Sequence, residues 1–311
     1  MPNATIAAAP DRLATTVTGD GAARVTALTL THSVETARKA HETLPVATAA
    51  LGRAMAGALL LAQGLKAPER LTLRLLGDGP LGGVVADASP EGDVRGYVKR
   101  PRVMLPPNAQ GKLDVGRAVG HAGVLHVSHD TGAGQPYTGS VPLVSGEIGE
   151  DLAHYLSTSL QIPSAVAVGV RVGSGGTVVG AGGLLVQRLP EGNADTLARV
   201  EAAIEAIAPL SSRVAEGMTA RALVVRLVEG IDHAPVRETP ARWQCTCTRE
   251  RTARLLASLG SEALDEMIDE DDGAELRCQF CGALYRFDGA ELSRLRRAPP
   301  AADGPADRGP H

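Results

Sequence analysis

The sequence of 311 residues predicts an α+β protein with more than one domain. Short runs of alternating apolar and polar residues follow one another along the chain, which favours neighbouring strands over a doubly wound sheet. Segments with helical spacing of apolar residues stand between groups of these runs. The composition then changes after Pro190, and every cysteine lies beyond residue 244.

These observations predict four parts of the chain. We expect a core domain of strands and packed helices at 1–190, a helical connector at 191–242 and a small zinc-binding module at 243–297. The tail at 298–311 consists largely of Pro, Gly, Asp and Ala and is predicted to be disordered. Hydrophobic residues make up 44% of the chain but aromatics only 2%, so the core must be built from Leu, Val, Ile and Ala.

The elements of the core domain follow from periodicity and from turn-forming Gly, Asp and Pro. Strands are predicted at two stretches within 11–31, then at 70–76, 81–88, 94–99, 124–129, 137–144, 164–172 and 177–189. Helices are predicted at 33–44, 46–65 and 147–160. Residues 101–120 are expected to form a loop.

The connector is predicted to be helical. Its first helix spans 194–207 with an apolar stripe, and a second helical segment runs from Pro209 to Val228. Pro235 and Pro240 are expected to mark its end.

Charge and hydropathy exclude several classes of partner. The net charge is −4, which is unlike the basic footprint of a nucleic-acid-binding protein. The most apolar stretch, 54–62, lies between Arg53 and Gln63 and is shorter than the roughly 20 residues of a membrane span. No secretory signal is visible. We therefore expect a cytoplasmic protein that binds neither nucleic acid nor membrane.

The four cysteines form two close pairs. Cys245 and Cys247 are separated by one residue, Cys278 and Cys281 by two, and thirty residues (248–277) lie between the pairs. Two close pairs separated by a loop supply four thiolates to one tetrahedral zinc ion, so we predict one Zn²⁺ per chain on these residues. The alternative is four unliganded thiols in a small helical domain.

The loop between the pairs is predicted to be helical. Thr248 can cap a helix that runs to Leu259 and ends at Gly260, and Ser261 can cap a second helix. Acidic residues follow without a basic residue among them, an arrangement unlike that of a zinc ribbon that binds phosphates. They are Glu262, Asp265, Glu266, Asp269, Glu270, Asp271, Asp272 and Glu275.

Zinc would hold this module together. A unit of about fifty residues with little apolar content is marginal alone, whereas zinc binding can contribute about 10–16 kcal/mol. Either pair could also close a local disulfide, and oxidation would expel the metal because a disulfide sulfur is no longer a thiolate ligand. Spacing alone leaves open whether the zinc site is a switch or an inert structural site.

Two other patterns suggest functional sites less strongly. The segment 77–82 matches a dinucleotide fingerprint, but a strand follows it instead of a helix, so a hairpin turn is predicted. His121, His126 and His129 lie close together, and we interpret them as ordinary polar positions. No convincing catalytic set emerges, and an enzyme is not expected.

Several segments, in this order along 10–292, resemble the redox-regulated 33 kDa heat-shock chaperonin family. In the module, the similar segments are 245–251 (CTCTRER) and 278–287 (CQFCGALYRF). In the core, they are 76–82 (LGDGPLG), 96–98 (GYV), 145–155 (SGEIGEDLAHY) and 161–164 (QIPS). Leu160 and Thr248 depart from the family's pattern, and neither is a cysteine.

The resemblance implies a bacterial cytosolic holdase that uses no ATP and protects against oxidative stress and heat. Its reduced form holds zinc on the four cysteines, and oxidation forms the disulfides Cys245–Cys247 and Cys278–Cys281 and releases the metal. The module and connector then unfold, apolar surface is exposed, and homodimers bind unfolding client proteins. Without the resemblance, a constitutive zinc-stapled protein- or nucleic-acid-binding protein and, less favoured, a thiol–disulfide enzyme remain as alternatives.

Overall fold

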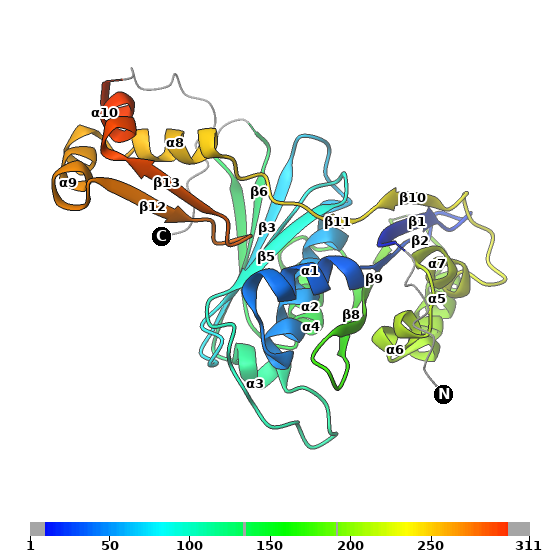
Figure 1. Ribbon diagram of the computed structural model, residues 1–311. Coiled ribbons are helices and arrows are strands. Elements are labelled where there is room, and N and C mark those ends of the chain that lie inside the picture. Colours follow the sequence, from blue (N-terminus) through cyan, green and yellow to red (C-terminus); the bar gives the residue numbers. More distant parts are fainter. Residues whose placement is uncertain (1–9, 133–134, 191, 298–311) are drawn as a thin grey trace. The chain divides into compact units, whose positions relative to one another are not determined.

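The computed structural model describes residues 10–132, 135–190 and 192–297 (Figure 1). They form a mixed α+β structure, as the sequence predicts, and divide into two compact units. The first unit extends to residue 244 apart from residues 132–134, and the second consists of 132–134 and the residues from Cys245 onward. The predicted tail lies outside the described residues, and the four-part division of the chain stays a prediction.

The first unit contains two sheets. The first sheet has the order β10-β1-β2-β9-β8, and every neighbouring pair in it is antiparallel. Its strands are β1 (Arg12–Val17), β2 (Ala23–Thr29), β8 (Ser164–Val172), β9 (Val178–Arg188) and β10 (Arg237–Pro240). Side chains alternate between its faces, so Leu13 belongs to one apolar cluster and Ala14 to another.

The second sheet has the order β11-β5-β4-β3-β6-β7 and is antiparallel except at β11–β5. Its strands are β3 (Arg70–Gly77), β4 (Val84–Ala88), β5 (Asp93–Val98), β6 (Gly123–Asp130), β7 (Tyr137–Pro142) and β11 (Arg242–Trp243). Because β3 pairs with β4, the glycine-rich segment 77–82 is a hairpin connection, as predicted. A Cβ at Gly79 would lie 2.4 Å from the Ala118 carbonyl oxygen, so the turn needs glycine for close packing.

Helix α2 (Pro45–Ala62) forms the centre of the first unit. It contacts β4 and β5 of the second sheet and β8 and β9 of the first, and only Pro45, Arg53 and Leu61 along it are not buried. Pro45 lies at the helix start, where its missing N–H costs nothing. The helix is long and apolar enough to cross a membrane, but 83% of it is buried inside the protein. It is therefore a core helix.

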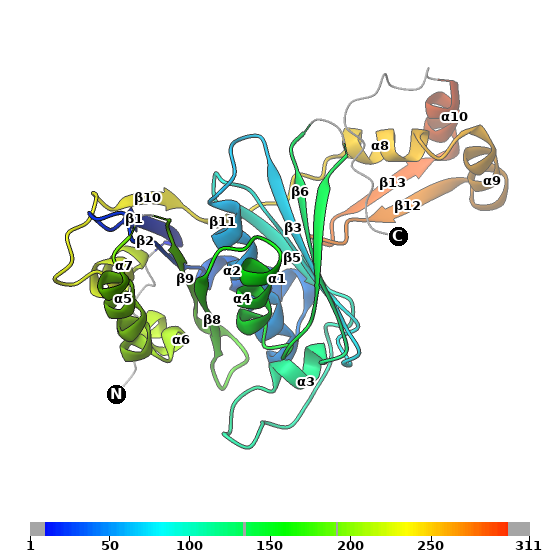
Figure 2. The same ribbon diagram turned by 180° about the vertical axis from the view of Figure 1, so that it is seen from behind.

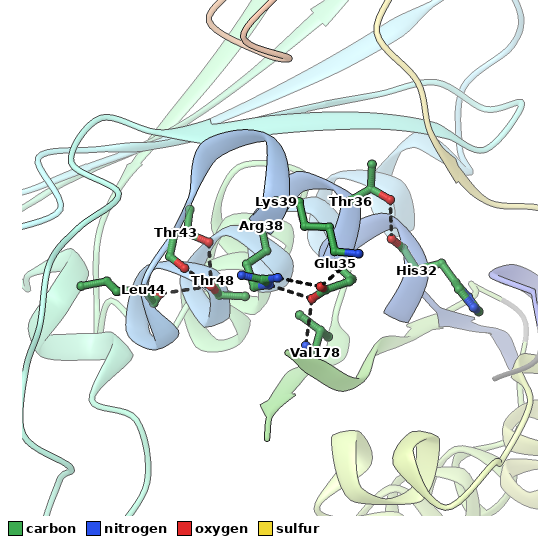
Figure 3. A network of polar contacts seen from close by, with 9 residues as sticks. All are labelled: His32, Glu35, Thr36, Arg38, Lys39, Thr43, Leu44, Thr48 and Val178. Atoms are coloured by element: carbon green, nitrogen blue, oxygen red, sulfur yellow. Dashed lines mark hydrogen bonds and ion pairs between the residues drawn. The ribbon is translucent and has the colours of Figure 1, made fainter. Parts of the chain in front are cut away.

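Helix α1 (Thr31–His41) is tied to β9 by a polar network (Figure 3). Glu35 accepts hydrogen bonds from the Arg38 guanidinium at 2.7 and 2.8 Å and from the Val178 backbone N–H at 3.0 Å. The Arg38 guanidinium is the main cause that holds the pKa of Glu35 below its usual value. The carboxylate therefore joins the helix to the start of the strand.

Two further helices complete the core. Helix α4 (Gly149–Thr158) lies within the predicted 147–160 helix. Helix α3 (Val115–Val119) lies in the segment predicted to be a loop, and that prediction is wrong here. Asp114 caps this single turn by accepting from the Arg117 N–H at 3.2 Å, and its apolar residues pack into the core.

The predicted connector consists of α5 (Ala194–Ile207), α6 (Leu210–Ala215) and α7 (Ala220–Leu227). In both views α6 and α7 lie against the first sheet, and their contacts are with β8 and β9 and with β1 and β2 (Figure 1 and Figure 2). Helix α7 buries Leu223, Val224 and Leu227 there, whereas α5 buries only Val200 and Ile207. Helix α6 also buries two side chains, Leu210 and Val214, but it has six residues and α5 has fourteen, so α5 has the smallest buried share of the three.

The end of the connector differs from the prediction. The sequence predicts only an end of the helical connector at Pro235 and Pro240. In the structure, residues 237–240 form β10 against β1, and 242–243 form β11 against β5. Pro240 is tolerated because β10 is an edge strand, where a missing N–H leaves no partner unsatisfied.

The second unit packs around four buried side chains, Leu256, Leu264, Phe287 and Leu292. Its elements are α8 (Arg249–Ala257), α9 (Ser261–Asp271), β12 (Gly273–Arg277), β13 (Leu284–Asp288) and α10 (Gly289–Arg297). The two helices agree with the sequence prediction in place, but the cap predicted at Ser261 is wrong. Gly260 occupies the cap position without a side-chain hydrogen bond, and Ser261 is the first helical residue.

Candidate metal centre

The first cysteine pair lies between β11 and α8, in a segment that is neither helix nor strand. Thr248 ends this stretch with extended dihedral angles, and its Oγ1 accepts a hydrogen bond from the Arg251 N–H at 3.1 Å. This bond caps α8, as predicted from the sequence. Because the cap fixes where the helix begins, Cys245 and Cys247 stay outside it and their thiols can approach the second pair.

The second pair forms the turn that joins β12 to β13. The Cys278 N–H donates to the Ala283 carbonyl at 2.9 Å, and the Gly282 N–H donates to the Cys278 carbonyl at 2.8 Å. Gly282 has a φ of 73°, a left-handed conformation that glycine adopts without strain. The antiparallel pairing of Arg277 with Leu284 closes the turn.

The four sulfur atoms come together, as the sequence predicts. The Sγ of Cys245 lies 3.4 Å from that of Cys247 and 3.7 Å from that of Cys278, and the Sγ atoms of Cys247 and Cys281 are 3.3 Å apart. All four lie within 4.8 Å of one another. Zinc–sulfur bonds of about 2.3 Å at tetrahedral angles place sulfurs about 3.8 Å apart. The cluster therefore has the size and donor chemistry of a four-thiolate metal site.

The electrostatics of the cluster call for a cation. The neighbouring Cys245 thiol, followed by burial, raises the pKa of Cys278 well above its ordinary value. Burial is also the main cause that raises the pKa of Cys281 to about 11. Without a metal the thiols of Cys278 and Cys281 therefore keep their protons. A divalent ion could displace these protons and balance the negative charge.

Residues around the sulfurs orient the two pairs. The Tyr285 hydroxyl on β13 donates to the Cys247 Sγ at 3.2 Å. Arg249 places its guanidinium 4.4 Å from the centre of the Phe287 ring and donates to Glu291 of α10 at 2.7 and 2.9 Å. Neither Tyr285 nor Arg249 was assigned a role from the sequence, because spacing along the chain does not show which sulfur or ring a side chain reaches.

The histidine cluster does not form a second site. His126 and His129 lie on β6 three positions apart, so their side chains point to opposite faces of the sheet. His126 Nδ1 is 2.7 Å from the Ser140 hydroxyl, and His129 Nε2 is 2.9 Å from Glu69. Among the residues that the structure describes, the cysteines are the only group of His, Cys, Asp or Glu arranged to hold a metal.

Comparison with known proteins shows the family of the chain. The family described as Hsp33 protein matches residues 11–288. A "33 kDa chaperonin" of Desulforamulus reducens is 44% identical over 92% of this chain and 97% of its own length. One of Symbiobacterium thermophilum is 46% identical over 92% and 97%.

A solved structure extends the match to three dimensions. The crystal structure of the 33 kDa chaperonin (heat shock protein 33 homolog) of Thermotoga maritima is similar, with a TM-score of 0.84 and 36% sequence identity. The match covers 93% of this chain and 98% of that one. Fold, sequence and family thus agree over both units, and this chain belongs to the Hsp33 family.

Proposed function

We propose that this protein is an ATP-independent chaperone whose client binding is switched on by oxidation of its four cysteines. Family membership supports the chaperone role and weighs against an enzyme. The observation that carries the switch is the gathering of four sulfurs, all within 4.8 Å, in a unit whose described residues bury only four apolar side chains. In the reduced form one Zn²⁺ per chain is held by Cys245, Cys247, Cys278 and Cys281.

Zinc is the ion that we propose because four thiolates are the commonest ligand set of structural zinc sites. Metal binding then supplies stability that the small core lacks, since a structural zinc ion contributes about 10–16 kcal/mol at neutral pH. Folding of the second unit is therefore coupled to zinc binding, so that the unit is folded only when the metal is bound. Any reaction that removes thiolate ligands should therefore unfold the unit.

The reaction is a two-electron oxidation of each pair. A thiolate attacks the O–O bond of hydrogen peroxide, giving a sulfenic acid and hydroxide, and the partner thiolate displaces a second hydroxide to form the disulfide. We propose the pairs Cys245–Cys247 and Cys278–Cys281. Sulfur distances in the reduced state do not select these pairs, because Cys247 is as close to Cys281 as to Cys245. Once zinc has left, the short loops within each pair cost the least entropy to close.

Unfolding of the second unit would affect the connector through the chain segment that precedes Cys245. The Gln244 N–H, one residue before Cys245, donates to the Val94 carbonyl of β5 at 2.9 Å, and β11 and β10 precede it. Unfolding of the second unit frees this strand segment at one end. Helix α5 has few buried residues to retain it. Loss of the connector would uncover an apolar face of the first sheet, formed by Ala14, Ala23, Val25, Ala27, Leu184 and Val186.

This uncovered face and the unfolded connector are the surfaces that we propose to bind unfolding client proteins, with homodimers as the active species. Grouped thiols fit a reducing compartment, so we place the protein in the bacterial cytoplasm, where it protects against oxidative stress and heat. We assign it no nucleic-acid or membrane partner.

Suppression of client aggregation tests the proposal. The full chain is assayed reduced with zinc, after peroxide with mild heat, and after re-reduction with zinc restored. We expect protection only in the oxidised sample. A variant with all four cysteines changed to Ser should protect without oxidant and ignore peroxide, because its second unit lacks the metal. Equal protection by the reduced and oxidised chain would overturn the switch and favour a constitutive binding protein.

A further inference from the structure

A tyrosine hydroxyl donates a hydrogen bond to one sulfur of the cysteine cluster. Tyr285 stands on β13 opposite Leu276 of β12, in the hairpin whose turn carries Cys278 and Cys281. Its hydroxyl nevertheless donates to the Sγ of Cys247, in the other pair, at 3.2 Å. The ring of Tyr285 also packs against the small apolar core of the unit. The contact therefore joins the β12–β13 hairpin, whose turn carries the second pair, to a sulfur of the first pair.

The sulfurs of the second pair have a different kind of donor. The Cys278 sulfur accepts from the backbone N–H groups of Cys281 and Phe280, and the Cys281 sulfur accepts from that of Ala283. These donors belong to the turn itself and remain whatever side chains are present. The donor to the Cys247 sulfur is the hydroxyl of the Tyr285 side chain, so one substitution can remove it.

We propose that Tyr285 is a positioning residue that slows the attack of Cys247 on peroxide and so raises the oxidant level at which the switch responds. An O–H donor withdraws electron density from a thiolate sulfur, and the sulfur becomes a weaker nucleophile. The inference rests on the proposed function, since it concerns the rate of the same oxidation.

The chemistry is the first step of the disulfide reaction. The Cys247 thiolate forms an S–O bond to one peroxide oxygen, the O–O bond breaks, and hydroxide leaves. The Cys245 thiolate, 3.4 Å away, then attacks that sulfur and displaces a second hydroxide. Sulfur is oxidised by two electrons and peroxide is reduced by two. The Tyr285 hydroxyl stabilises the thiolate before the first bond forms, which raises the barrier to that step alone.

The expected size of the effect follows from general values. A hydrogen bond to a charged acceptor favours the bonded state by about ten- to a hundredfold, and the rate of thiolate attack follows such a stabilisation with an exponent of about 0.4–0.5. Loss of the hydroxyl should therefore accelerate oxidation roughly three- to tenfold.

The test compares Tyr285→Phe with Tyr137→Phe in the zinc-loaded full chain. Tyr285→Phe keeps the ring in the apolar core, and Tyr137 is 63% exposed on β7, so its variant removes a hydroxyl with no role at the metal. Zinc release by peroxide is followed with a chromophoric chelator. We expect full zinc content in both reduced variants, a three- to tenfold faster release for Tyr285→Phe, and the wild-type rate for Tyr137→Phe.

Replacement of zinc by cobalt provides a spectroscopic measurement of the thiolates. Its absorption band would not shift if Tyr285 had only a structural role. Loss of the hydrogen bond should shift the thiolate-to-cobalt charge-transfer band of Tyr285→Phe to lower energy. Incorporation of 3-fluorotyrosine, a stronger donor, should slow zinc release in the wild-type chain and have no effect in Tyr285→Phe. This second measurement needs no disruptive substitution.

The outcomes separate this inference from the proposed function. If the wild-type chain keeps its zinc under peroxide, the switch itself fails. If it releases zinc but Tyr285→Phe reacts at the same rate with an unshifted band, only the role of Tyr285 is overturned. Zinc loss from reduced Tyr285→Phe without peroxide would also overturn it, by showing that the residue holds the fold.

Discussion

Helix α2 and the cysteine-bearing unit are stabilised in opposite ways. Almost every residue of α2 is buried between two sheets, in an apolar cluster that draws on most elements of the first unit. The described residues of the second unit bury four apolar side chains and bring together four sulfurs. Apolar burial persists under oxidants, whereas thiolate ligands do not. Under the proposed function, this contrast lets one chain keep a stable core while a small unit responds to oxidation.

Zinc removal should have the largest effect, because it should destabilise the second unit and leave α2 unchanged. Treating the reduced chain with a chelator removes a contribution of about 10–16 kcal/mol, so β12 and β13 should lose amide protection while α2 keeps it. Hydrogen exchange read by mass spectrometry checks both regions in one sample. The Cys281→Ser variant, with three ligands left, should behave like the chelated protein. Retained protection in β12 and β13 would show that the unit folds without metal.

Leu59→Ala tests the apolar side of the comparison. Leu59 is fully buried in α2, so the cavity should lower the free energy of unfolding of the first unit by about 2–5 kcal/mol, read from urea titration. Zinc content should stay at the wild-type value. Leu160→Ala, at a residue that is 41% exposed, is the matched control and should change little. A zinc site weakened by Leu59→Ala would contradict separate sources of stability.

Leu292→Ala makes the same deletion in the second unit. Leu292 is fully buried there, and because folding and metal binding are coupled, its loss should appear as weaker zinc binding, by about tenfold or more. Competition with a chromophoric chelator measures the affinity. Leu255→Ala on α8, where the side chain is 49% exposed, should bind zinc like the wild type. Unchanged affinity in Leu292→Ala would mean that the fold does not depend on the metal.

Glu35→Gln should have the smallest effect. The Arg38 guanidinium lowers the pKa of Glu35 below the ordinary 4.5, so its stabilisation is present above that pH and is lost as the pH falls through the lower folded value. We expect a loss of about 1 kcal/mol or less at pH 7, and no difference from wild type in strong acid. Urea titrations at both pH values check this. Glu216→Gln, an exposed pair with Arg213, is the control, and an equal loss there would refute a special role for Glu35.

Much of the first unit could be predicted from the sequence because its elements follow regular periods. The strand β10 could not, since Thr15 pairs with Arg237 across a separation that no local pattern records. Its Pro240 even suggested a break, and only the edge position in the sheet makes that residue acceptable. The hairpin β12–β13 was missed because the acidic run before it hides the short alternation in 273–277.

The cluster of four cysteines was predictable from the sequence as a set of residues, but its geometry was not. Spacing alone identified the four cysteines, because paired thiols need only be close in sequence to converge on one ion. The hydrogen bond from Tyr285 to Cys247 depends on the register of the hairpin, which places this side chain beside the other pair. Nothing in the sequence around Tyr285 indicates that its hydroxyl bonds to Cys247.

Hydrogen exchange before and after oxidation tests the central claim most directly. The zinc-loaded reduced chain is compared with a peroxide-treated sample whose zinc release is measured in parallel. We expect β12, β13 and α5 to lose amide protection as zinc leaves, while α2 remains protected. Full zinc release with β12, β13 and α5 still protected would contradict the claim that the metal holds these regions folded.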